Sequence, residues 1–219
     1  MTELGIYGGT FSPPHIGHIR AAHAFMEQVE LDKLMIIPTY VSPHKKYTSA
    51  NGAEDGDIRL EMLKIAFETD ENGKKGKLEV SSCEVLEKRP SYTVYTLRRF
   101  ASPDTRITLL CGTDMFLTLE TWFEAAEIFK LARIALIRRE KQNYETEKQI
   151  KEATELFNEK YGADIIQVIA EPFEVSSTEI RDALISGENV DRFLPKKLAD
   201  YIRNNGYYGA IPEGKSESR

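Results

Sequence analysis

Short apolar runs alternate along the chain with longer segments in which apolar residues recur about every 3.6 positions. The runs have the pattern of strands buried on both faces of a parallel sheet, and they comprise residues 4–7, 33–40, 77–82, 106–112, 132–139 and 163–170. The periodic segments predict amphipathic helices, which comprise residues 16–29, 57–69, 94–101, 145–161, 176–187 and 195–205. This alternation predicts repeated strand–helix units.

The order of these elements predicts the fold class. Strand, helix and strand follow one another within residues 4–40, and such a βαβ order implies a parallel sheet. We therefore predict an α/β protein with a doubly wound parallel sheet, Rossmann-like in architecture, and a C-terminal helical appendage. We expect a single domain over residues 1–209 and a flexible tail over residues 210–219. Residues 41–56 are polar and predict a long loop of the kind that often carries function.

Composition and charge narrow the class of protein. Hydrophobic residues make up 41% of the chain and charged residues 29%, which is typical of a globular protein. A net charge of −6 argues against a broad nucleic-acid surface, although a small phosphate site needs only a few local donors. We expect neither a membrane span nor a secretory signal, because the sequence contains no matching apolar run. Cys83 and Cys111 lie far apart, so we expect a reduced, cytoplasmic protein.

A stretch rich in glycine and histidine, GIYGGTFSPPHIGHIR, joins the first predicted strand to the first predicted helix. Gly8, Gly9 and Thr10 fall at the carboxyl end of the strand, where doubly wound sheets bind ligands. Glycine lets backbone N–H groups approach a phosphate, and the helix N-terminus that follows adds partial positive charge. His15 and His18 lie one helical turn apart and should project from the same face. The combination predicts a site for a phosphate chain.

Two other interpretations of the histidine pair must be weighed. One is a glycine turn before a helix that carries histidines by chance. With 4 His and 14 Gly in the chain, composition alone gives roughly 0.005 expected H-x-G-H matches. The other is a zinc pair, but neither His23 nor His44 is placed to supply a third clustered ligand. Gly17, between the two histidines, is expected to leave room for a ligand.

A second segment, EVSSTEIR, also opens a predicted helix, with Ser176 or Ser177 as its cap. Ser177 and Thr178 add hydroxyl and N–H groups at the helix start, and Arg181 follows one turn later. Alone, such a segment is an ordinary capped helix. Together with the glycine–histidine stretch, it predicts a second phosphate cradle that faces the first across the crevice of the sheet.

These two motifs together resemble the nucleotidyltransferase superfamily that carries the H-x-G-H signature. Three further segments, VSPHKK, RPSYTVYTL and GTDMFLTLETW, resemble bacterial nicotinate-mononucleotide adenylyltransferases, and FLPKKLADYIRNNGYYG resembles the closing helix of that family. The likeness extends over residues 4–208. It is the ordered combination of segments that is specific, because each one alone is common.

The resemblance implies transfer of AMP from ATP to nicotinate mononucleotide in NAD biosynthesis, with deamido-NAD and pyrophosphate as products and with Mg²⁺ carried on the ATP. His15 and His18 would be the catalytic pair. ATP and its phosphates would lie against Gly8, Gly9, Thr10, Phe11, His15, His18, Lys45, Gly112, Asp114, Ser177, Thr178 and Arg181. Nicotinate mononucleotide would lie against His44, Lys45, Tyr92, Thr93 and Trp122.

Within that set the resemblance implies particular roles. The pyridine ring would stack on Trp122, and its carboxylate would lie near the backbone of Tyr92 and Thr93. Asp114 would accept hydrogen bonds from ribose hydroxyls. No residue is assigned as a metal ligand, and few protein carboxylates are required, because Mg²⁺ would bridge the ATP phosphates and keep most of its waters.

Two positions depart from the family pattern, in which Asp is frequent at both. Ser12 cannot serve as a carboxylate, so any direct metal contact there is in doubt, but it could cap the first helix. Tyr95 has no evident role in the sequence.

Two alternative functions stay open at this point. A phosphopantetheine adenylyltransferase shares both phosphate motifs but lacks the PSYT and ETW segments. A regulatory module could sense ATP or NAD without turnover. The oligomeric state, including a homo-oligomer, is also left open by the sequence.

Overall fold

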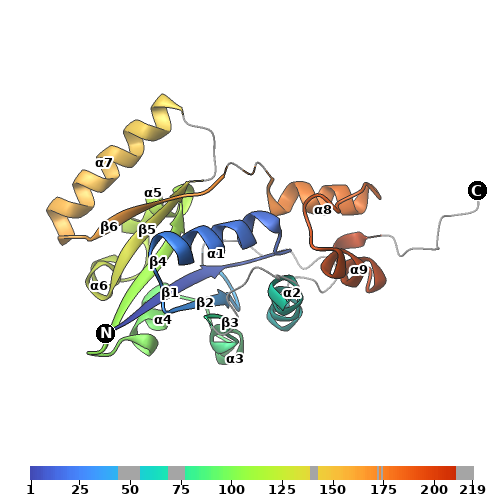
Figure 1. Cartoon of the computed structure of the whole chain (residues 1–219), viewed down its shortest axis with the longest axis horizontal. Helices are drawn as coiled ribbons and strands as arrows, with labels where there is room; N and C mark the ends of the chain where they lie inside the picture. The colour runs from blue at the N-terminus through green and yellow to red at the C-terminus, as the bar shows by residue number, and fades with distance from the viewer. Residues whose placement is uncertain (44–54, 69–76, 139–142, 172, 174, 211–219) are drawn as a thin grey trace, which may run out of the picture.

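The computed structural model describes residues 1–43, 55–68, 77–138, 143–171, 173 and 175–210. These residues form a six-stranded sheet in the order β3-β2-β1-β4-β5-β6, in which every neighbouring pair is parallel (Figure 1). The strands are β1 (Thr2–Gly9), β2 (Lys33–Pro38), β3 (Leu78–Val80), β4 (Thr105–Gly112), β5 (Ala132–Arg138) and β6 (Ile165–Ile169). The strand order reverses between β1 and β4, which confirms the predicted doubly wound sheet.

Residues along each strand alternate between two hydrophobic layers, one on either side of the sheet. On β1, Tyr7 packs in the first layer, whereas Leu4 and Ile6 pack in the second. On β2, Ile36 and Ile37 are divided between the layers in the same way. The strands therefore read as continuous apolar runs in the sequence, because both of their faces are covered.

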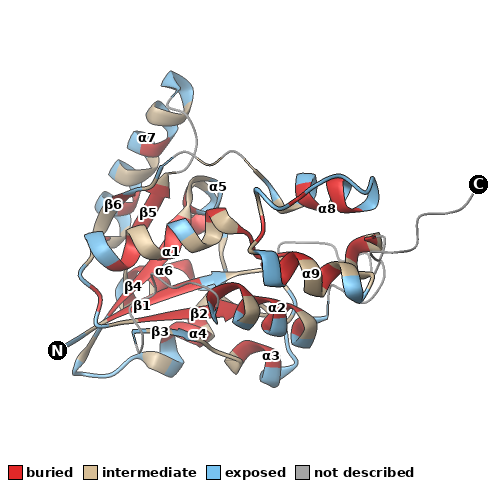
Figure 2. Cartoon of the chain, turned by 45° about the vertical axis from the view of Figure 1, so that its right-hand side comes forward, coloured by how far each residue is buried: buried red, intermediate tan, exposed pale blue. Residues whose placement is uncertain are grey.

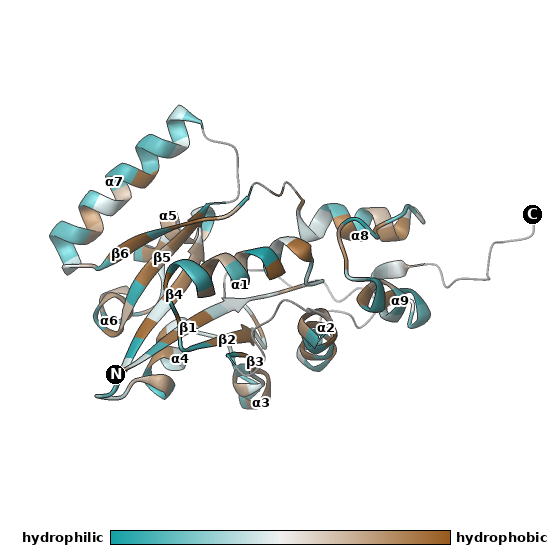
Figure 3. Ribbon diagram, in the orientation of Figure 1, coloured by the Kyte–Doolittle hydropathy of each residue, from teal (hydrophilic) through white to brown (hydrophobic). Residues whose placement is uncertain are grey.

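Helices lie on both faces of the sheet, whereas α8 (Ser177–Ile185) and α9 (Lys196–Asn204) lie beyond the carboxyl ends of the strands (Figure 2). The first layer is covered by α1 (Ile16–Gln28) and α2 (Gly56–Glu68), and its buried cluster extends to α8 and α9. The second is covered by α4 (Thr93–Phe100), α5 (Thr113–Thr118), α6 (Ala125–Leu131) and α7 (Tyr144–Tyr161). Helix α7 is largely hydrophilic (Figure 3) and buries only Ile150 and Phe157 among its 18 residues.

Several short elements were not predicted from the pattern. They are α3 (Cys83–Glu87), α5, the 3₁₀ turn η1 (Leu119–Thr121), α6 and the 3₁₀ turn η2 (Tyr207–Gly209). Each spans at most about two helical turns, which is too few to reveal a 3.6-residue repeat. Two of them, α3 and α5, follow strands directly and help to form the crevice at the carboxyl ends of the sheet.

The C-terminal helices share their core with the N-terminal half of the chain. Residues of α8 and α9 belong to the same buried cluster as α1 and α2, and Tyr208 of η2 joins them. Ala210 is buried, and residues 211–219 lie outside the described part of the chain. In the described residues, no helix combines the length and the apolar character that crossing a membrane requires.

Candidate active site

A cavity of about 620 Å³ opens at the carboxyl ends of β1 and β4, where the strand order reverses. This is the place at which doubly wound sheets bind their ligands. Of the residues predicted for the site, those that line the cavity are Gly8, Gly9, Thr10, Phe11, His18, Tyr92, Thr93, Gly112, Asp114 and Trp122. The volume suits a dinucleotide-sized ligand, and residues predicted for ATP and for nicotinate mononucleotide both contribute to the wall.

The turn after β1 combines an open glycine with a packed aromatic ring. A Cβ atom placed on Gly8 would meet nothing within 4 Å, so the cavity extends to its backbone. Phe11 adopts a left-handed backbone conformation with φ of 50°. Its ring packs edge-on against Tyr7 at 5.3 Å and against His18 at 5.0 Å between centroids. The ring of Phe11 therefore supports His18, while the backbone of Gly8 stays accessible from the cavity.

The two histidines are coupled by a backbone hydrogen bond. His15 is the N-cap of α1, and its backbone N–H donates to Nδ1 of His18 at 3.1 Å. The two rings lie 3.7 Å apart between centroids. Because Nδ1 of His18 accepts a hydrogen, a neutral His18 ring carries its own hydrogen on Nε2. His15 is buried and His18 lines the cavity, so the pair consists of an inner and an outer ring.

Gly17 does not leave space for a ligand, and that expectation was wrong. A Cβ atom at this position would meet the ring of Phe173 at 2.9 Å and the ring of His15 at 3.0 Å. Glycine is required here because these two rings approach the first turn of α1 closely. The space that the sequence assigned to a ligand is occupied by side chains that fix the inner histidine.

The second motif packs against the segment that links the glycine turn to α1. Ser177 donates its hydroxyl to the carbonyl oxygen of Pro13 at 3.1 Å. Arg181 donates to the carbonyl oxygen of Ser12 at 2.7 Å and to Oγ1 of Thr178 at 3.0 Å. The structure thus brings both motifs together. Ser177, Thr178 and Arg181 are nevertheless not among the residues that line the cavity, so they lie beside it.

Ser12 does not cap α1, because the capping position is occupied by His15. Instead, Ser12 donates its hydroxyl to the phenol oxygen of Tyr208 at 3.2 Å. Ser12 is therefore held to the C-terminal elements in two ways. Its side chain contacts Tyr208, and its carbonyl oxygen accepts a hydrogen bond from Arg181.

The opposite wall of the cavity is built from the start of α4 and from aromatic rings. Tyr92 is the N-cap of α4, and its own N–H donates to the carbonyl oxygen of Pro90 at 3.1 Å. The N–H of Thr93, the first residue of the helix, has no acceptor within the helix. Beside it, the rings of Tyr92 and Phe123 lie 4.8 Å apart, and Phe123 and Trp122 also line the cavity. Phe123 was not predicted as part of the site.

Tyr95 now has a structural role. Its ring packs edge-on against Tyr92 and Phe123, at 5.9 Å from each centroid, and the guanidinium of Arg89 lies over its face at 4.6 Å. Tyr95 therefore supports the aromatic wall from behind, and it is not itself among the residues that line the cavity.

The remaining predicted residues divide into two groups. Gly112 caps α5, and Asp114 lies exposed in the first turn of that helix, at the rim of the cavity. His44 and Lys45, which were expected on a loop, lie outside the described residues.

Two buried charged residues near the site were missed by sequence reasoning. Arg59 of α2 is fully buried and donates to the carbonyl oxygens of Thr10, Thr39 and Tyr40. Glu84 of α3 is 9% exposed and lines the cavity. Burial raises the pKa of Glu84, and the hydroxyls of Thr96 and Ser91 offset only part of that effect. The sequence did contain a signal for Arg59, because the 3.6-residue spacing of the apolar residues in α2 places Arg59 on the buried face of that helix.

Comparison with known proteins decides the family. Residues 6–183 match the Cytidylyltransferase-like family. A protein of Desulfatibacillum aliphaticivorans, described as a probable nicotinate-nucleotide adenylyltransferase, is 34% identical over 230 residues, covering 94% of this chain and 99% of that protein. A protein of Clostridium kluyveri with the same description is 32% identical, covering 95% of this chain and 100% of that protein. The chain belongs to the nicotinate-nucleotide adenylyltransferase family.

Solved structures of nicotinate-nucleotide adenylyltransferases share the fold. The Plasmodium falciparum nicotinic acid mononucleotide adenylyltransferase complexed with APC has a TM-score of 0.71 at 15% identity, covering 96% of this chain and 98% of that chain. The same enzyme complexed with NaAD has a TM-score of 0.68 at 14% identity, with the same coverage of each chain. Membership of the family was predicted from the ordered motifs and is confirmed.

Proposed function

We propose that the protein transfers AMP from ATP to nicotinate mononucleotide and releases nicotinic acid adenine dinucleotide, that is deamido-NAD, and pyrophosphate. The observation that carries this proposal is the likeness to nicotinate-nucleotide adenylyltransferases, at 30% identity or more, over nearly the whole chain. It is supported by one cavity that combines a glycine–histidine turn with a helix start and an aromatic wall.

The ATP phosphates would lie along Gly8, Gly9, Thr10 and Phe11, beneath His18. Oriented backbone N–H groups and the N-terminus of α1 favour negative charge there. Ser177, Thr178 and Arg181 would extend this binding surface toward the outer phosphates from α8. Lys45 would reach the phosphates from residues outside the described part of the chain, and His44 would accompany it.

Charge stabilisation, and not proton abstraction, would drive the reaction. The nucleophile is a phosphate monoester whose second pKa is about 6, so it needs no general base at neutral pH. Its oxygen would attack the α-phosphorus of ATP in line with the departing pyrophosphate, without a covalent intermediate. Nε2–H of His18 would donate to the phosphate oxygens as charge develops on them. His15 would keep that donor oriented through its backbone N–H.

A divalent metal, Mg²⁺ in our proposal, would neutralise phosphate charge when it is bound with ATP. In the described residues, no three His, Cys, Asp or Glu side chains gather to hold a metal ion. The carboxylates at the cavity are Glu84, which is buried, and Asp114, which is exposed. This donor set fits a metal that is held mainly by the phosphates of its substrate. Asp114 would stand nearby and accept hydrogen bonds from a ribose.

The pyridine ring of nicotinate mononucleotide would stack on Trp122, with Tyr92 and Phe123 beside it. A pyridinium ring is cationic, and the indole face is the best aromatic partner for a cation. The carboxylate would accept hydrogen bonds from the N–H groups that begin at Thr93. An amide would have to turn one of its own donors toward these donors, or lose a charge-assisted bond.

A turnover assay tests the proposal. With ATP and Mg²⁺, we expect pyrophosphate release on addition of nicotinate mononucleotide, and lower kcat/KM with nicotinamide mononucleotide. Greater activity on 4′-phosphopantetheine would move the protein to a different adenylyltransferase. Binding of ATP without turnover of any of these acceptors would favour a nucleotide sensor.

A further inference from the structure

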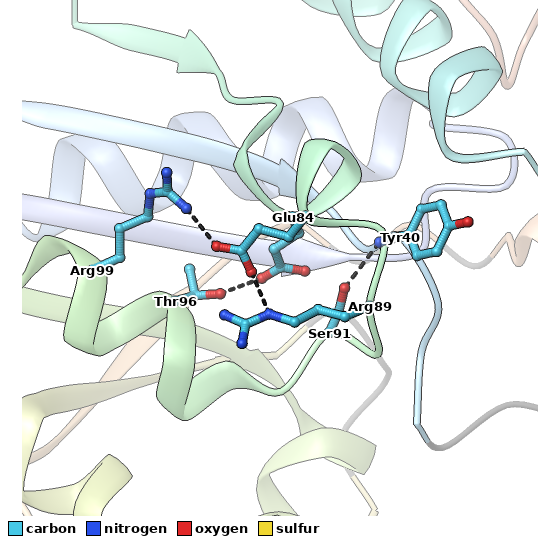
Figure 4. A network of polar contacts seen from close by, with 7 residues as sticks. Tyr40, Glu84, Arg89, Ser91, Thr96 and Arg99 are labelled. Atoms are coloured by element: carbon cyan, nitrogen blue, oxygen red, sulfur yellow. Dashed lines mark hydrogen bonds and ion pairs between the residues drawn. The ribbon is translucent and has the colours of Figure 1, made fainter.

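Glu84 occupies an unusual environment for a carboxyl group. It is buried, yet it lines the cavity, and its Oε1 accepts a hydrogen bond from the hydroxyl of Thr96 at 2.5 Å (Figure 4). Its second oxygen, Oε2, is also buried and makes no hydrogen bond of good geometry with any described residue, although the hydroxyl of Ser91 also acts on the carboxyl group. An ionised carboxylate with an unsatisfied buried oxygen is strongly disfavoured. These surroundings therefore favour the neutral acid.

Thr96 lies in the first turn of α4, three residues after Thr93. Through this hydroxyl, Glu84 of α3 is fixed to the helix whose first residue, Thr93, lines the cavity. A second contact holds the residues just before α4, because Tyr40 donates its N–H to Oγ of Ser91 at 2.9 Å (Figure 4). Ser91 in turn donates its N–H to the carbonyl oxygen of Val41 at 2.9 Å.

A negative charge on Glu84 would compete with a bound anion at this helix start. Helix N-termini stabilise one nearby negative charge, and two carboxylates that share the same surroundings repel each other. The other charged groups that act on Glu84 are Arg59, from α2, and Glu87, on its own helix. Glu87 is engaged by Arg89 at 2.7 Å and by Arg99 at 2.5 Å, on the exposed side of α3.

We propose that Glu84 is a positioning residue for the substrate carboxylate: as a neutral acid bonded to Thr96, it holds the first turn of α4 with its N–H groups toward the cavity and places no like charge beside the ligand. This inference rests on the proposed function, because it names a determinant of the preference for nicotinate over nicotinamide. Glu84 acts through α4 and is not itself a reacting group.

Steady-state kinetics on four variants test the inference. Glu84→Ala should raise the KM for nicotinate mononucleotide by about tenfold, equivalent to about 1.4 kcal/mol. The KM for ATP should stay within about twofold, because the phosphate turn is not touched. The ratio of kcat/KM for the acid to kcat/KM for the amide should fall by a similar factor. Thr96→Val, which leaves the carboxyl in place, should have the same effect if the hydrogen bond to α4 is what matters.

Glu84→Gln is the rescue variant. Its amide has the shape of the neutral acid and can still accept from Thr96, so it should restore the KM for nicotinate mononucleotide. Glu87→Gln is the matched control on the same helix, because it weakens an exposed tie to α4 without touching the cavity. It should leave both KM values unchanged. Circular dichroism and thermal melting establish that each variant is folded.

Three results would overturn the inference. Equal increases in the two KM values after Glu84→Ala would indicate a general structural role. An unchanged ratio of acid to amide efficiency would remove Glu84 from specificity. A Glu84→Gln variant as impaired as Glu84→Ala would mean that the charged form is the working one. If Glu84→Ala does not fold, Thr96→Val decides by the same criteria. Failure of the proposed function itself is separate, because the wild-type protein would then not turn over nicotinate mononucleotide.

Discussion

The backbone N–H of His15 points at Nδ1 of His18 and fixes which nitrogen of the outer imidazole carries hydrogen. The spacing of the H-x-G-H motif thus has a structural reason beyond placing two rings on one face. The first histidine caps the helix, and its amide sets the tautomer of the second.

This relationship predicts the effect of substitutions at His18. His18→Ala should lower kcat by roughly 10²–10³, the loss expected when one preorganised donor to the transition state is removed. His18→Gln, whose side-chain NH₂ lies near the position of Nε2, should retain more activity than His18→Asn, whose NH₂ lies near that of Nδ1. Steady-state kinetics with both substrates measure the effect. A normal kcat in His18→Ala would remove the histidine from the mechanism.

Gly5 and Gly8 on the same strand should respond differently to a methyl group. A Cβ on Gly5 would lie 2.3 Å from Cδ1 of Leu31 and 2.9 Å from the ring of Phe25, whereas one on Gly8 would meet nothing within 4 Å. Gly5→Ala should therefore lower the free energy of unfolding by about 1–3 kcal/mol, as overpacked cores do.

Gly8→Ala serves as the matched comparison. It should leave the melting temperature close to that of the wild type but raise the KM for ATP, because the methyl group enters space left for the ligand. Thermal melting and kinetics on both variants separate the two effects. A Gly8→Ala protein with unchanged KM values would place the ligand elsewhere.

Trp122 should report binding of the pyridine substrate. It is the single tryptophan of the chain and lines the cavity, so its fluorescence carries no background from other indoles. Nicotinate mononucleotide should quench the emission in a saturable way, because the pyridinium accepts an electron from the stacked indole, whereas ATP alone should have little effect. Trp122→Leu should raise the KM for the mononucleotide by roughly 2- to 30-fold. Unchanged emission during normal turnover would show that Trp122 does not stack on the ring.

Glu84 should make stability depend on pH in a defined direction. Burial raises the pKa of Glu84 in the folded protein above its ordinary value of 4.5. Below 4.5 the carboxyl is protonated in both states. As the pH rises above 4.5 and through the folded pKa, the unfolded chain releases its proton more readily, so this contribution to stability is lost. Glu84→Gln lacks this effect, so its stability relative to wild type should improve as the pH rises. Urea unfolding of both proteins across this range measures it.

The hydrophobic pattern was sufficient for the sheet, whose strands appear as continuous apolar runs, and for the long helices, whose 3.6-residue period extends over many residues. The doubly wound parallel fold and the family were also correctly predicted, since the first βαβ unit and the ordered motifs limit the alternatives. Short helices such as α5 and α6 were missed, because so few residues cannot establish a period.

The site was harder to predict where the deciding contact involves the backbone or a distant segment. Gly17 was misread because the ring that fills the space beside it, Phe173, comes from a part of the chain more than 150 residues away. The helical spacing of Arg59 indicated a buried position, but its acceptors could not be predicted, because they are main-chain carbonyls that leave no trace in side-chain patterns. Glu84 lies on a short helix that the pattern did not reveal.

The hydrogen bonds of Ser12 with Arg181 and Tyr208 have a consequence for the synthesis of the enzyme on the ribosome. Ser12 lies in the segment that leads into the histidine helix, and it is held by Arg181 and by Tyr208, which follow it by 169 and 196 residues. A ribosome therefore synthesises the glycine–histidine turn long before either partner. A nascent chain that has not yet reached Arg181 contains the motif but not its supports. Catalytic competence should therefore appear only after Tyr208 has left the ribosomal exit tunnel.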